Sequence, residues 1–299
     1  MNILITGAWQ QAKEYIAEIE AMGHKVFFLQ YEKDELPCKY DEVEGVICNG
    51  LFLHHPIERF TKLIYIQLTS AGYDRVPMDY VSAHNIVINN AKGVYSVPMA
   101  EFALCGVLQL YKQSRFFYEN QKAHKWEKHR GLMELSGKTV CIVGCGSVGT
   151  ECAKRFSTFA CKVIGVDIVT RQDDNFCEMV ELGELDDALK VSDVVALTLP
   201  LTDDTYHLID ADRLACMKPT VILVNIARGA VVDTKALADS LINKGIYGAV
   251  LDVFEDEPLR EDSSLWDMDN VILTPHVSFI GDGNDCRLTD LIMKKLTYL

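Results

Sequence analysis

The segment from residue 138 to residue 167 constrains the fold of this 299-residue chain more than any other. It opens with an apolar run of strand length, Val140 to Val143, and three glycines follow in the spacing G-x-G-x-x-G. A helical pattern comes next, and a second strand-like run, Lys162 to Val166, ends at Asp167. The three glycines are Gly144, Gly146 and Gly149. This order predicts a strand, a tight turn, a helix and a parallel strand.

Each part of this segment has a physical role in binding a dinucleotide. The first glycine permits the tight turn, the second lets the backbone approach a pyrophosphate, and the third lets the helix pack closely on the strand. The pyrophosphate would lie at the N-terminus of the helix that begins near Ser147, where N–H groups point outward. Asp167 can accept hydrogen bonds from an adenosine ribose. Because all the parts agree, dinucleotide binding is favoured over a purely structural glycine turn.

The composition is that of an ordinary globular protein, with 49% hydrophobic and 24% charged residues. The length suffices for two domains. With 29 basic and 43 acidic side chains the net charge is −14, which argues against nucleic acid or an anionic membrane as the main partner. An anionic substrate must therefore be held by local positive groups. The N-terminus shows no signal-peptide pattern, and no apolar run is long enough to span a membrane.

The ten cysteines favour a reduced, cytoplasmic protein, because they form no C-x-x-C motif and most lie in apolar runs. Cys145 lies inside the glycine turn, where a small buried residue is favoured over a thiol acting near the cofactor. His124 and His129 are spaced poorly for a metal site, so their stretch is interpreted as solvated surface or a subunit-contact arm. The cysteines predicted to be core residues are Cys48, Cys105, Cys141 and Cys161.

Strands and helices alternate through most of the chain, which predicts parallel sheets covered on both faces. The expected class is α/β with two doubly wound domains. A substrate domain of flavodoxin-like type comprises residues 1–95 plus 281–299, and a Rossmann domain comprises residues 96–280 and is inserted in it. A long helical pattern runs over residues 96–119. The strand candidates of the first domain are Asn2–Thr6, Val26–Leu29, Gly45–Cys48, Leu63–Leu68 and Ile86–Asn89.

Three polar side chains follow later strands, so they should gather at the sheet edge that carries the glycine turn. They are Arg228, Glu257 and His276. Hydride transfer to a 2-oxo acid needs a planar cation for the carboxylate, which suits arginine. It also needs a proton donor beside the carbonyl oxygen, which suits histidine. A carboxylate behind the imidazole would orient it and favour its protonated form.

Each of these residues alone has a simpler interpretation. Arg228 can be a surface turn residue, Glu257 lies in the acidic run EDEP, and His276 can cap a strand. Their shared position after strands favours the set. Among other histidines, His54 and His55 lack an acid at useful spacing, and His207 is more typical of surface. The small residues after the Leu63–Leu68 strand, TSAGYD at 69–74, fit either a carboxylate cradle or an ordinary turn.

Seven segments together resemble the D-isomer-specific 2-hydroxyacid dehydrogenases, and the run LWDMDN at 265–270 resembles their glyoxylate/hydroxypyruvate reductases. The resemblance implies hydride exchange between NAD(H) and a small 2-oxo or D-2-hydroxy acid, in a homodimer formed through the region after residue 98. The segments are TSAGYD (69–74), PMAEFAL (98–104), the glycine turn with Asp167, LPLTDDT (199–205), NIARGAVVD (225–233), LDVFEDEPL (251–259) and NVILTPHVS (270–278).

The resemblance also implies roles for single residues. It makes His276 the acid/base, Glu257 its partner and Arg228 the group that binds the substrate. The substrate carboxylate would meet the backbone of Ser70, Ala71 and Gly72. Asp252 resembles the residue that fixes the nicotinamide carboxamide. The further cofactor contacts would be Ser147, Val148, Leu199, Pro200, Thr205, Ile226 and Ala227, together with Arg228 and His276.

Two questions stay open from the sequence. Asp167 favours NAD because its charge would repel the 2′-phosphate of NADP, whereas Arg171 would bind that phosphate if it turned inward. The alternative to an enzyme is an NAD(H)-sensing binding protein of the same fold without significant turnover. Catalytic assays separate these two functions.

Overall fold

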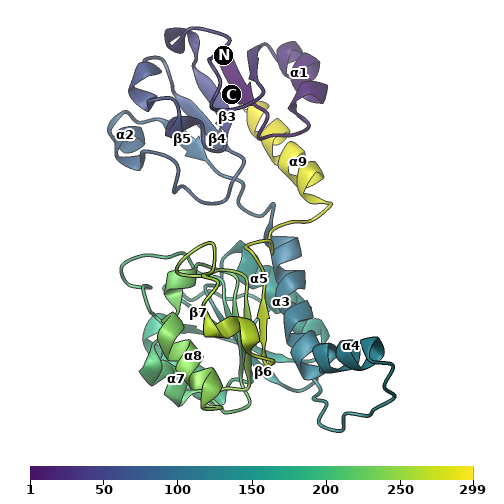
Figure 1. The fold of residues 1–299 in the computed structure, drawn as a ribbon. Coiled ribbons are helices and arrows are strands. Elements are labelled where there is room, and N and C mark those ends of the chain that lie inside the picture. Colours follow the sequence, from purple (N-terminus) through teal and green to yellow (C-terminus); the bar gives the residue numbers. More distant parts are fainter. Residues whose placement is uncertain (299) are drawn as a thin grey trace. The chain divides into compact units, whose positions relative to one another are not determined.

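The computed structural model describes residues 1–298 and divides the chain into two compact units (Figure 1). Unit 1 combines Met1–Tyr95 with the returning segment from Gly281, and unit 2 is the continuous stretch Ser96–Ile280. Each unit has its own parallel sheet, and the two sheets have five and seven strands. The predicted α/β class with two parallel sheets is therefore confirmed.

Unit 1 is built on a parallel sheet with the strand order β2-β1-β3-β4-β5, which is the order of flavodoxin-like folds. The predicted strands all form, although β4 and β5 begin two residues and one residue later than the apolar pattern suggests, and β2 begins one residue earlier. The strands are β1 (Asn2–Thr6), β2 (Lys25–Leu29), β3 (Gly45–Cys48), β4 (Tyr65–Leu68) and β5 (Val87–Asn89).

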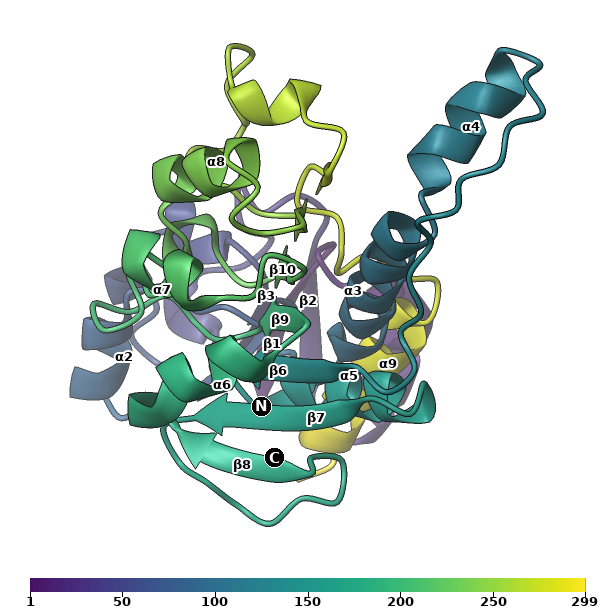
Figure 2. The same ribbon diagram turned by 90° about the horizontal axis from the view of Figure 1, so that it is seen from below.

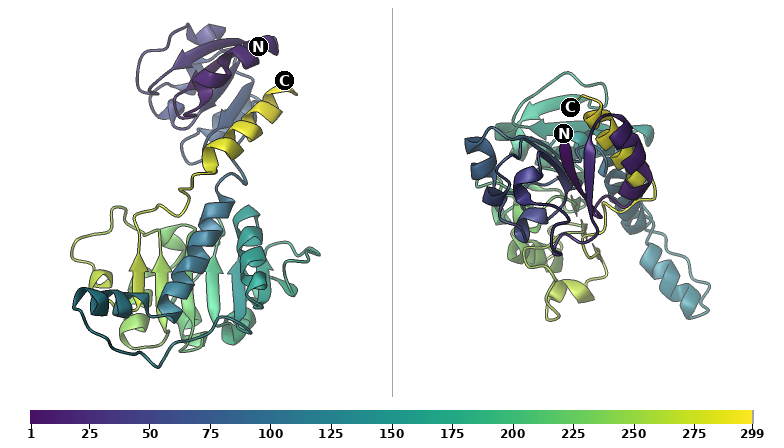
Figure 3. Two further views of the ribbon diagram at one scale, coloured as in Figure 1. Left: turned by 90° about the vertical axis from the view of Figure 1, so that its right-hand side faces the viewer. Right: turned by 90° about the horizontal axis from the view of Figure 1, so that it is seen from above.

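Helices cover both faces of this sheet because alternate strand residues point to opposite sides. Ile3 and Ile5 pack with α1 (Ala12–Ala21) and α9 (Asn284–Leu296), which lie together on one face (Figure 3). Leu4 faces the other side, toward α2 (Met78–Ala83) and three short 3-10 turns. The 3-10 turns are Tyr40–Glu42, Leu51–Leu53 and Ile57–Arg59.

Unit 2 is built on a seven-stranded parallel sheet with the order β12-β11-β10-β9-β6-β7-β8. From β6 the chain adds β7 and β8 on one side of the sheet, and it then adds β9 to β12 on the other side. Ligands of such sheets bind at the carboxyl ends of the strands beside the point where this order reverses, which here lies between β6 and β9. The strands are β6 (Thr139–Val143), β7 (Lys162–Asp167), β8 (Glu178–Glu181), β9 (Val194–Leu197), β10 (Ile222–Asn225), β11 (Gly248–Leu251) and β12 (Val271–Leu273).

The central strands of unit 2 are buried on both faces, which explains their continuous apolar runs. Val140 and Ile142 point to the face covered by α3 (Ser96–Tyr111) and α5 (Ser147–Thr158). Cys141 and Val143 point to the opposite face. The helices there are α6 (Leu185–Val191), α7 (Ala211–Cys216) and α8 (Thr234–Ile242). Unit 2 also has 3-10 turns at Leu182–Glu184, Gly229–Val231 and Ser264–Asp267.

The helical pattern over residues 96–119 is interrupted in the structure. The helix α3 ends at Tyr111, and a second helix, α4 (Ser114–Lys122), projects from unit 2 away from its sheet (Figure 2). Gln113 breaks the helix with a left-handed φ of 52°, and its side-chain amide donates to the Leu110 carbonyl and to Tyr247 Oη. Long-range hydrogen bonding therefore decides a break that periodicity did not reveal.

The exposure of Cys105 and the presence of an edge strand differ from what the sequence pattern indicates. Cys48, Cys141 and Cys161 are buried as expected, but Cys105 is exposed on the outer side of α3, so its prediction as a core residue is wrong. The edge strand β8 was not predicted, because Glu178 and Glu181 give it little apolar character. Within residues 1–298, no helix is both long and apolar enough to cross a membrane.

Candidate active site

The glycine turn between β6 and α5 has the geometry that its spacing predicts. Gly144 has a φ of +94°, and a Cβ at this position would stand 2.7 Å from the Leu199 backbone. A Cβ on Gly149 would overlap the Gly144 carbonyl oxygen, so only glycine lets α5 pack this closely. A Cβ on Gly146 would meet nothing within 4 Å, so the space in front of the helix N-terminus is open.

The N-terminus of α5 is suited to an anion. Its N-cap residue is Gly146, and no side chain caps the first N–H groups. Asp167, at the end of β7, accepts hydrogen bonds from the N–H groups of Cys145 and Ile168, both at 2.7 Å. This carboxylate therefore lies beside the glycine turn, where the ribose of a bound dinucleotide would be expected.

Arg171 turns inward toward the glycine turn. Its Nη2 donates to the Cys145 carbonyl oxygen at 2.7 Å and to Thr150 Oγ1 at 3.0 Å. It also forms an ion pair of 3.1 Å with Asp173, which balances much of its charge. Its guanidinium is thus fixed near Asp167 by three oxygen acceptors.

Cys145 serves the turn as a small buried residue. Its side chain packs under the turn, and a Cβ on Gly165 would stand 2.7 Å from its sulfur. Burial, with a further contribution from Asp167, raises the pKa of the Cys145 thiol to about 12. The thiol is therefore protonated at neutral pH, which removes the nucleophilic form.

The three polar residues of the predicted set follow the neighbouring strands β10, β11 and β12 and lie at one sheet edge. His276 Nδ1 lies 2.9 Å from Glu257 Oε2, and the other Glu257 oxygen accepts the Phe254 N–H. Among residues 1–298, His276 Nε2 has no hydrogen-bond partner. The imidazole side chain as a whole is 42% exposed.

The backbone holds His276 in an unusual conformation. Its φ is +53°, and its N–H donates to the Asp252 carbonyl oxygen at 2.8 Å. The fully buried Asp252 side chain accepts hydrogen bonds from Thr274 Oγ1 and from the N–H groups of Val277 and Ser278. Asp252 thus anchors both sides of His276, and these bonds explain how a left-handed histidine is maintained.

Arg228 lies on the segment after β10 and is half-buried. Asn225 fixes this segment, since its amide oxygen accepts the Ala227 N–H and its amide nitrogen donates to the Arg228 carbonyl. Gly229 touches the backbone of Phe254 so closely that any Cβ would overlap it. The segments that carry Arg228 and Glu257 are therefore packed backbone to backbone.

The remaining predicted cofactor residues occupy the same edge of unit 2. Ile226 and Ala227 are buried, as is Leu199 at the turn after β9. Thr205 shapes that turn, because its hydroxyl donates to the Pro200 carbonyl and accepts the Thr202 N–H. Ser147 and Val148 lie in the first turn of α5 and are partly exposed.

The predicted carboxylate cradle, Ser70–Gly72, lies in unit 1 after β4. All three carbonyl groups of this turn are bound, since the Ala91 N–H donates to Ser70, the Asn90 side chain donates to Ala71, and Ser70 Oγ donates to Gly72. Within the described residues, the N–H groups of Ala71 and Gly72 have no hydrogen-bond partner. Free N–H groups at a strand end are the feature that an anion cradle requires.

The sequence did not reveal a second histidine–glutamate pair. His207 Nε2 lies 2.9 Å from Glu255 Oε2, and Glu255 Oε1 accepts the Thr234 N–H at 2.9 Å. Burial alone would raise the pKa of the Glu255 carboxyl, but its hydrogen bonds with Thr234 and His207 hold the pKa below its ordinary value. The only sequence signal was the acid in EDEP, which was considered for Glu257 alone.

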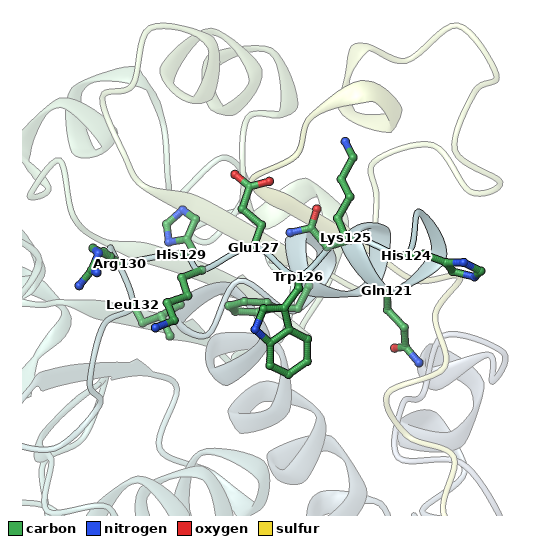
Figure 4. Close-up of a pocket in the computed structure, with 11 residues that line it drawn as sticks. Gln121, His124, Lys125, Trp126, Glu127, His129, Arg130 and Leu132 are labelled. Carbon is green, nitrogen blue, oxygen red and sulfur yellow. The ribbon is translucent and has the colours of Figure 1, made fainter.

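A pocket of about 880 Å³ lies in the arm formed by α4 and the segment up to Leu132. Figure 4 shows its lining, in which Trp126 stands out from the segment. This indole is 99% exposed, and Leu132 is 43% exposed. His124 and His129 both line this pocket, and no group of three possible metal ligands occurs in residues 1–298.

The chain is similar in sequence to known proteins. Residues 104–278 match the family model of the D-isomer specific 2-hydroxyacid dehydrogenase, NAD binding domain. The chain is 37% identical to a glyoxylate reductase of Thermofilum pendens over 77% of this chain and 70% of the relative. It is 34% identical to a glyoxylate reductase of Korarchaeum cryptofilum over 90% of this chain and 86% of the relative.

The fold is also similar to a solved structure, a D-isomer specific 2-hydroxyacid dehydrogenase family protein from Aeromonas salmonicida. The TM-score is 0.84 at 28% identity, and the match covers 99% of this chain and 94% of the other. The glycine turn, the strand order and these matches lead to one conclusion. The chain belongs to the D-isomer specific 2-hydroxyacid dehydrogenase family, a family of NAD-dependent oxidoreductases.

Proposed function

We propose that this protein transfers a hydride between NAD(H) and a small 2-oxo acid or D-2-hydroxy acid. In this proposal His276 is the acid/base, Glu257 is its partner, and Arg228 binds the substrate. The observation that carries the proposal is the hydrogen bond between His276 Nδ1 and Glu257, which leaves Nε2 without a hydrogen-bond partner among residues 1–298. Similarity to glyoxylate reductases supports a small substrate such as glyoxylate or hydroxypyruvate.

The residues present fit a bound dinucleotide. The open space before Gly146 and the uncapped N–H groups of α5 would hold the pyrophosphate, and Asp167 would hold the adenosine ribose. When bound, NADH supplies the hydride for the reduction. Leu199, Ile226 and Ala227 give the same edge an apolar lining that favours exclusion of water.

The protein's own groups would then manage charge and protons. His276 Nε2 gives its proton to the carbonyl oxygen as that oxygen becomes an alcohol, and the hydrogen bond between Glu257 and Nδ1 orients the ring for the transfer. Arg228 presents a planar guanidinium that matches a carboxylate. In unit 1, the free N–H groups of Ala71 and Gly72 are also suited to bind a carboxylate.

NAD is the preferred nucleotide in this proposal. Asp167 would repel a 2′-phosphate, and the Arg171 guanidinium beside it is already paired with Asp173. Asp167→Ala should raise the ratio of NADPH to NADH efficiency by about tenfold, because one repulsive charge near the ribose is worth about 1.4 kcal/mol or more. An unchanged ratio would count against Asp167 as the ribose ligand.

The active form in this proposal is a cytoplasmic homodimer. The exposed Trp126 and the projecting α4 arm support a contact with a second copy, and the ten free cysteines support a reducing compartment. Light scattering after gel filtration measures the mass. A monomer at micromolar concentration, or a dimer that Trp126→Ala leaves unaltered, would remove this part of the proposal.

The experiment that tests the function is NADH consumption by the purified protein. The substrates are glyoxylate, hydroxypyruvate, pyruvate and longer 2-oxo acids, each repeated with NADPH. Clear turnover of one acid supports the proposal and ranks the substrate sizes together with the cofactors. No turnover with tight NADH binding would contradict it and favour an NAD(H)-sensing protein.

A further inference from the structure

Glu255 connects three separate segments of unit 2 with one carboxylate. Oε2 pairs with His207 Nε2 from the turn after β9, and Oε1 accepts the Thr234 N–H at the start of α8. Glu255 itself lies on the segment after β11. Both oxygens therefore bind residues that are distant from Glu255 in the sequence: His207 is 48 residues away and Thr234 is 21 residues away.

These segments carry the residues that the proposed function needs. Glu255 lies two positions before Glu257, and the Glu257 carboxylate in turn accepts the Phe254 N–H at 3.1 Å. Thr234 follows directly on the stretch that begins at Arg228. The backbone of His207 also binds that stretch, since its N–H donates to the Ala230 carbonyl at 2.8 Å.

The contact is less exposed to solvent than an ordinary surface pair. The side chains of His207 and Glu255 are 29% and 30% exposed, whereas those of the nearby pair Arg260–Asp262 are both 70% exposed. Solvent screens the second pair far more. The His207 ring is also stacked on Tyr206, with centroids 4.1 Å apart, which fixes its direction.

We propose that His207 and Glu255 are positioning residues, which form a clamp that holds the Glu257 segment against the Arg228 segment. The proposal rests on the proposed function, because it assigns the clamp to the placement of Glu257 behind His276. The clamp does not touch the reacting atoms. Its loss lets the Phe254–Glu257 segment move, so Glu257 meets His276 less often in the productive geometry.

The decisive variant is His207→Asn. His207 has a left-handed φ of +47°, which asparagine tolerates well, and the shorter side chain does not reach Glu255. His207→Gln is the conservative partner, because its amide can still donate to the carboxylate. His84→Asn is the matched control, since His84 also stacks on a tyrosine but belongs to unit 1, where its Nδ1 bonds the Tyr80 carbonyl oxygen.

The expected result is a fall in kcat of about tenfold for His207→Asn, with NADH affinity unchanged within about twofold. His207→Gln should recover most of this loss, and His84→Asn should behave as the parent protein. In a Glu257→Gln background, His207→Asn should have almost no further effect, because a clamp that acts through Glu257 has nothing left to position. Equal losses in both backgrounds, or no loss in the parent, would overturn the proposal.

A second measurement works without turnover. Hydrogen–deuterium exchange of residues 252–258 should become faster in His207→Asn and in Glu255→Gln, and stay unchanged in His84→Asn. Unchanged exchange in both clamp variants would also overturn the proposal. Failure of the proposed function looks different: the parent protein would then turn over none of the 2-oxo acids, or His276→Asn and Glu257→Gln would keep its full turnover. The exchange experiment would still decide whether the clamp exists.

Discussion

The two histidine–glutamate pairs of unit 2 resemble each other closely but differ in what they leave free. Both have a nitrogen–oxygen distance of 2.9 Å, and both histidines have a left-handed backbone. Glu257 binds His276 through Nδ1, so Nε2 has no hydrogen-bond partner among residues 1–298, whereas Glu255 binds His207 through Nε2 itself. A histidine–carboxylate distance alone therefore does not identify an acid/base, and the nitrogen that remains available does.

The second oxygen of each glutamate strengthens this contrast. The second oxygen of Glu257 accepts a hydrogen bond from the N–H of Phe254, three residues earlier in the same segment. The second oxygen of Glu255 accepts a hydrogen bond from the N–H of Thr234, at the start of α8. The first pair thus joins the segment after β11 to the segment after β12, whereas Glu255 joins three segments, so the two pairs should respond differently to substitution.

The largest expected effect is that of His276→Asn. Removing the proposed proton donor should lower kcat for 2-oxo acid reduction by about 10³-fold, while NADH binding persists. His207→Asn, at a similar distance from a glutamate, should lose only about tenfold. Steady-state kinetics with a fluorescence titration of NADH measures both quantities. Near-full turnover of His276→Asn with an unaltered pH dependence would end the assignment of the acid/base.

Arg228→Lys should have the next largest effect. Lysine keeps the charge but lacks the planar fork, so kcat/KM for the 2-oxo acid should fall by about 10²-fold. The loss should be concentrated in KM for the acid, with little change for NADH. A variant with normal KM would show that another cation holds the carboxylate.

Glu257→Gln should lower the reduction rate by roughly tenfold, because a neutral amide holds the His276 ring less firmly than a carboxylate does. Glu255→Gln is the comparison variant, because it leaves the hydrogen bond between Glu257 and His276 in place. Steady-state kinetics measures the rate of both variants. An unchanged rate in Glu257→Gln would separate Glu257 from the proton transfer.

The smallest expected effect concerns stability. The pKa of Glu255 is lower in the folded protein than its ordinary value, so the ionised form stabilises the fold at pH values above about 4.3, the value of an unfolded glutamate. This contribution is lost as pH falls through the folded-state pKa. Urea midpoints should therefore differ between the parent and Glu255→Gln at pH 6 and converge toward pH 3. A constant difference would show that charge is not responsible.

Local sequence patterns were sufficient for the fold class and the glycine turn. The alternation of apolar strands and helices predicted two parallel sheets, and the five strands predicted for unit 1 all form within two residues of their predicted starts. The glycine turn follows from short-range sterics: Gly144 needs a positive φ, and Gly149 leaves no room for a Cβ. Such constraints act within a few residues, so a sequence reveals them directly.

Tertiary structure decided what depends on distant partners. The same run, EDEP, supplies one glutamate to His276 and another to His207, and no local pattern distinguishes their directions. The break at Gln113 follows from its bond to Tyr247, 134 residues away, and the exposure of Cys105 from the side of α3 on which it lies. Side chains in irregular segments take their direction from long-range hydrogen bonds and packing, which the order of residues alone does not state.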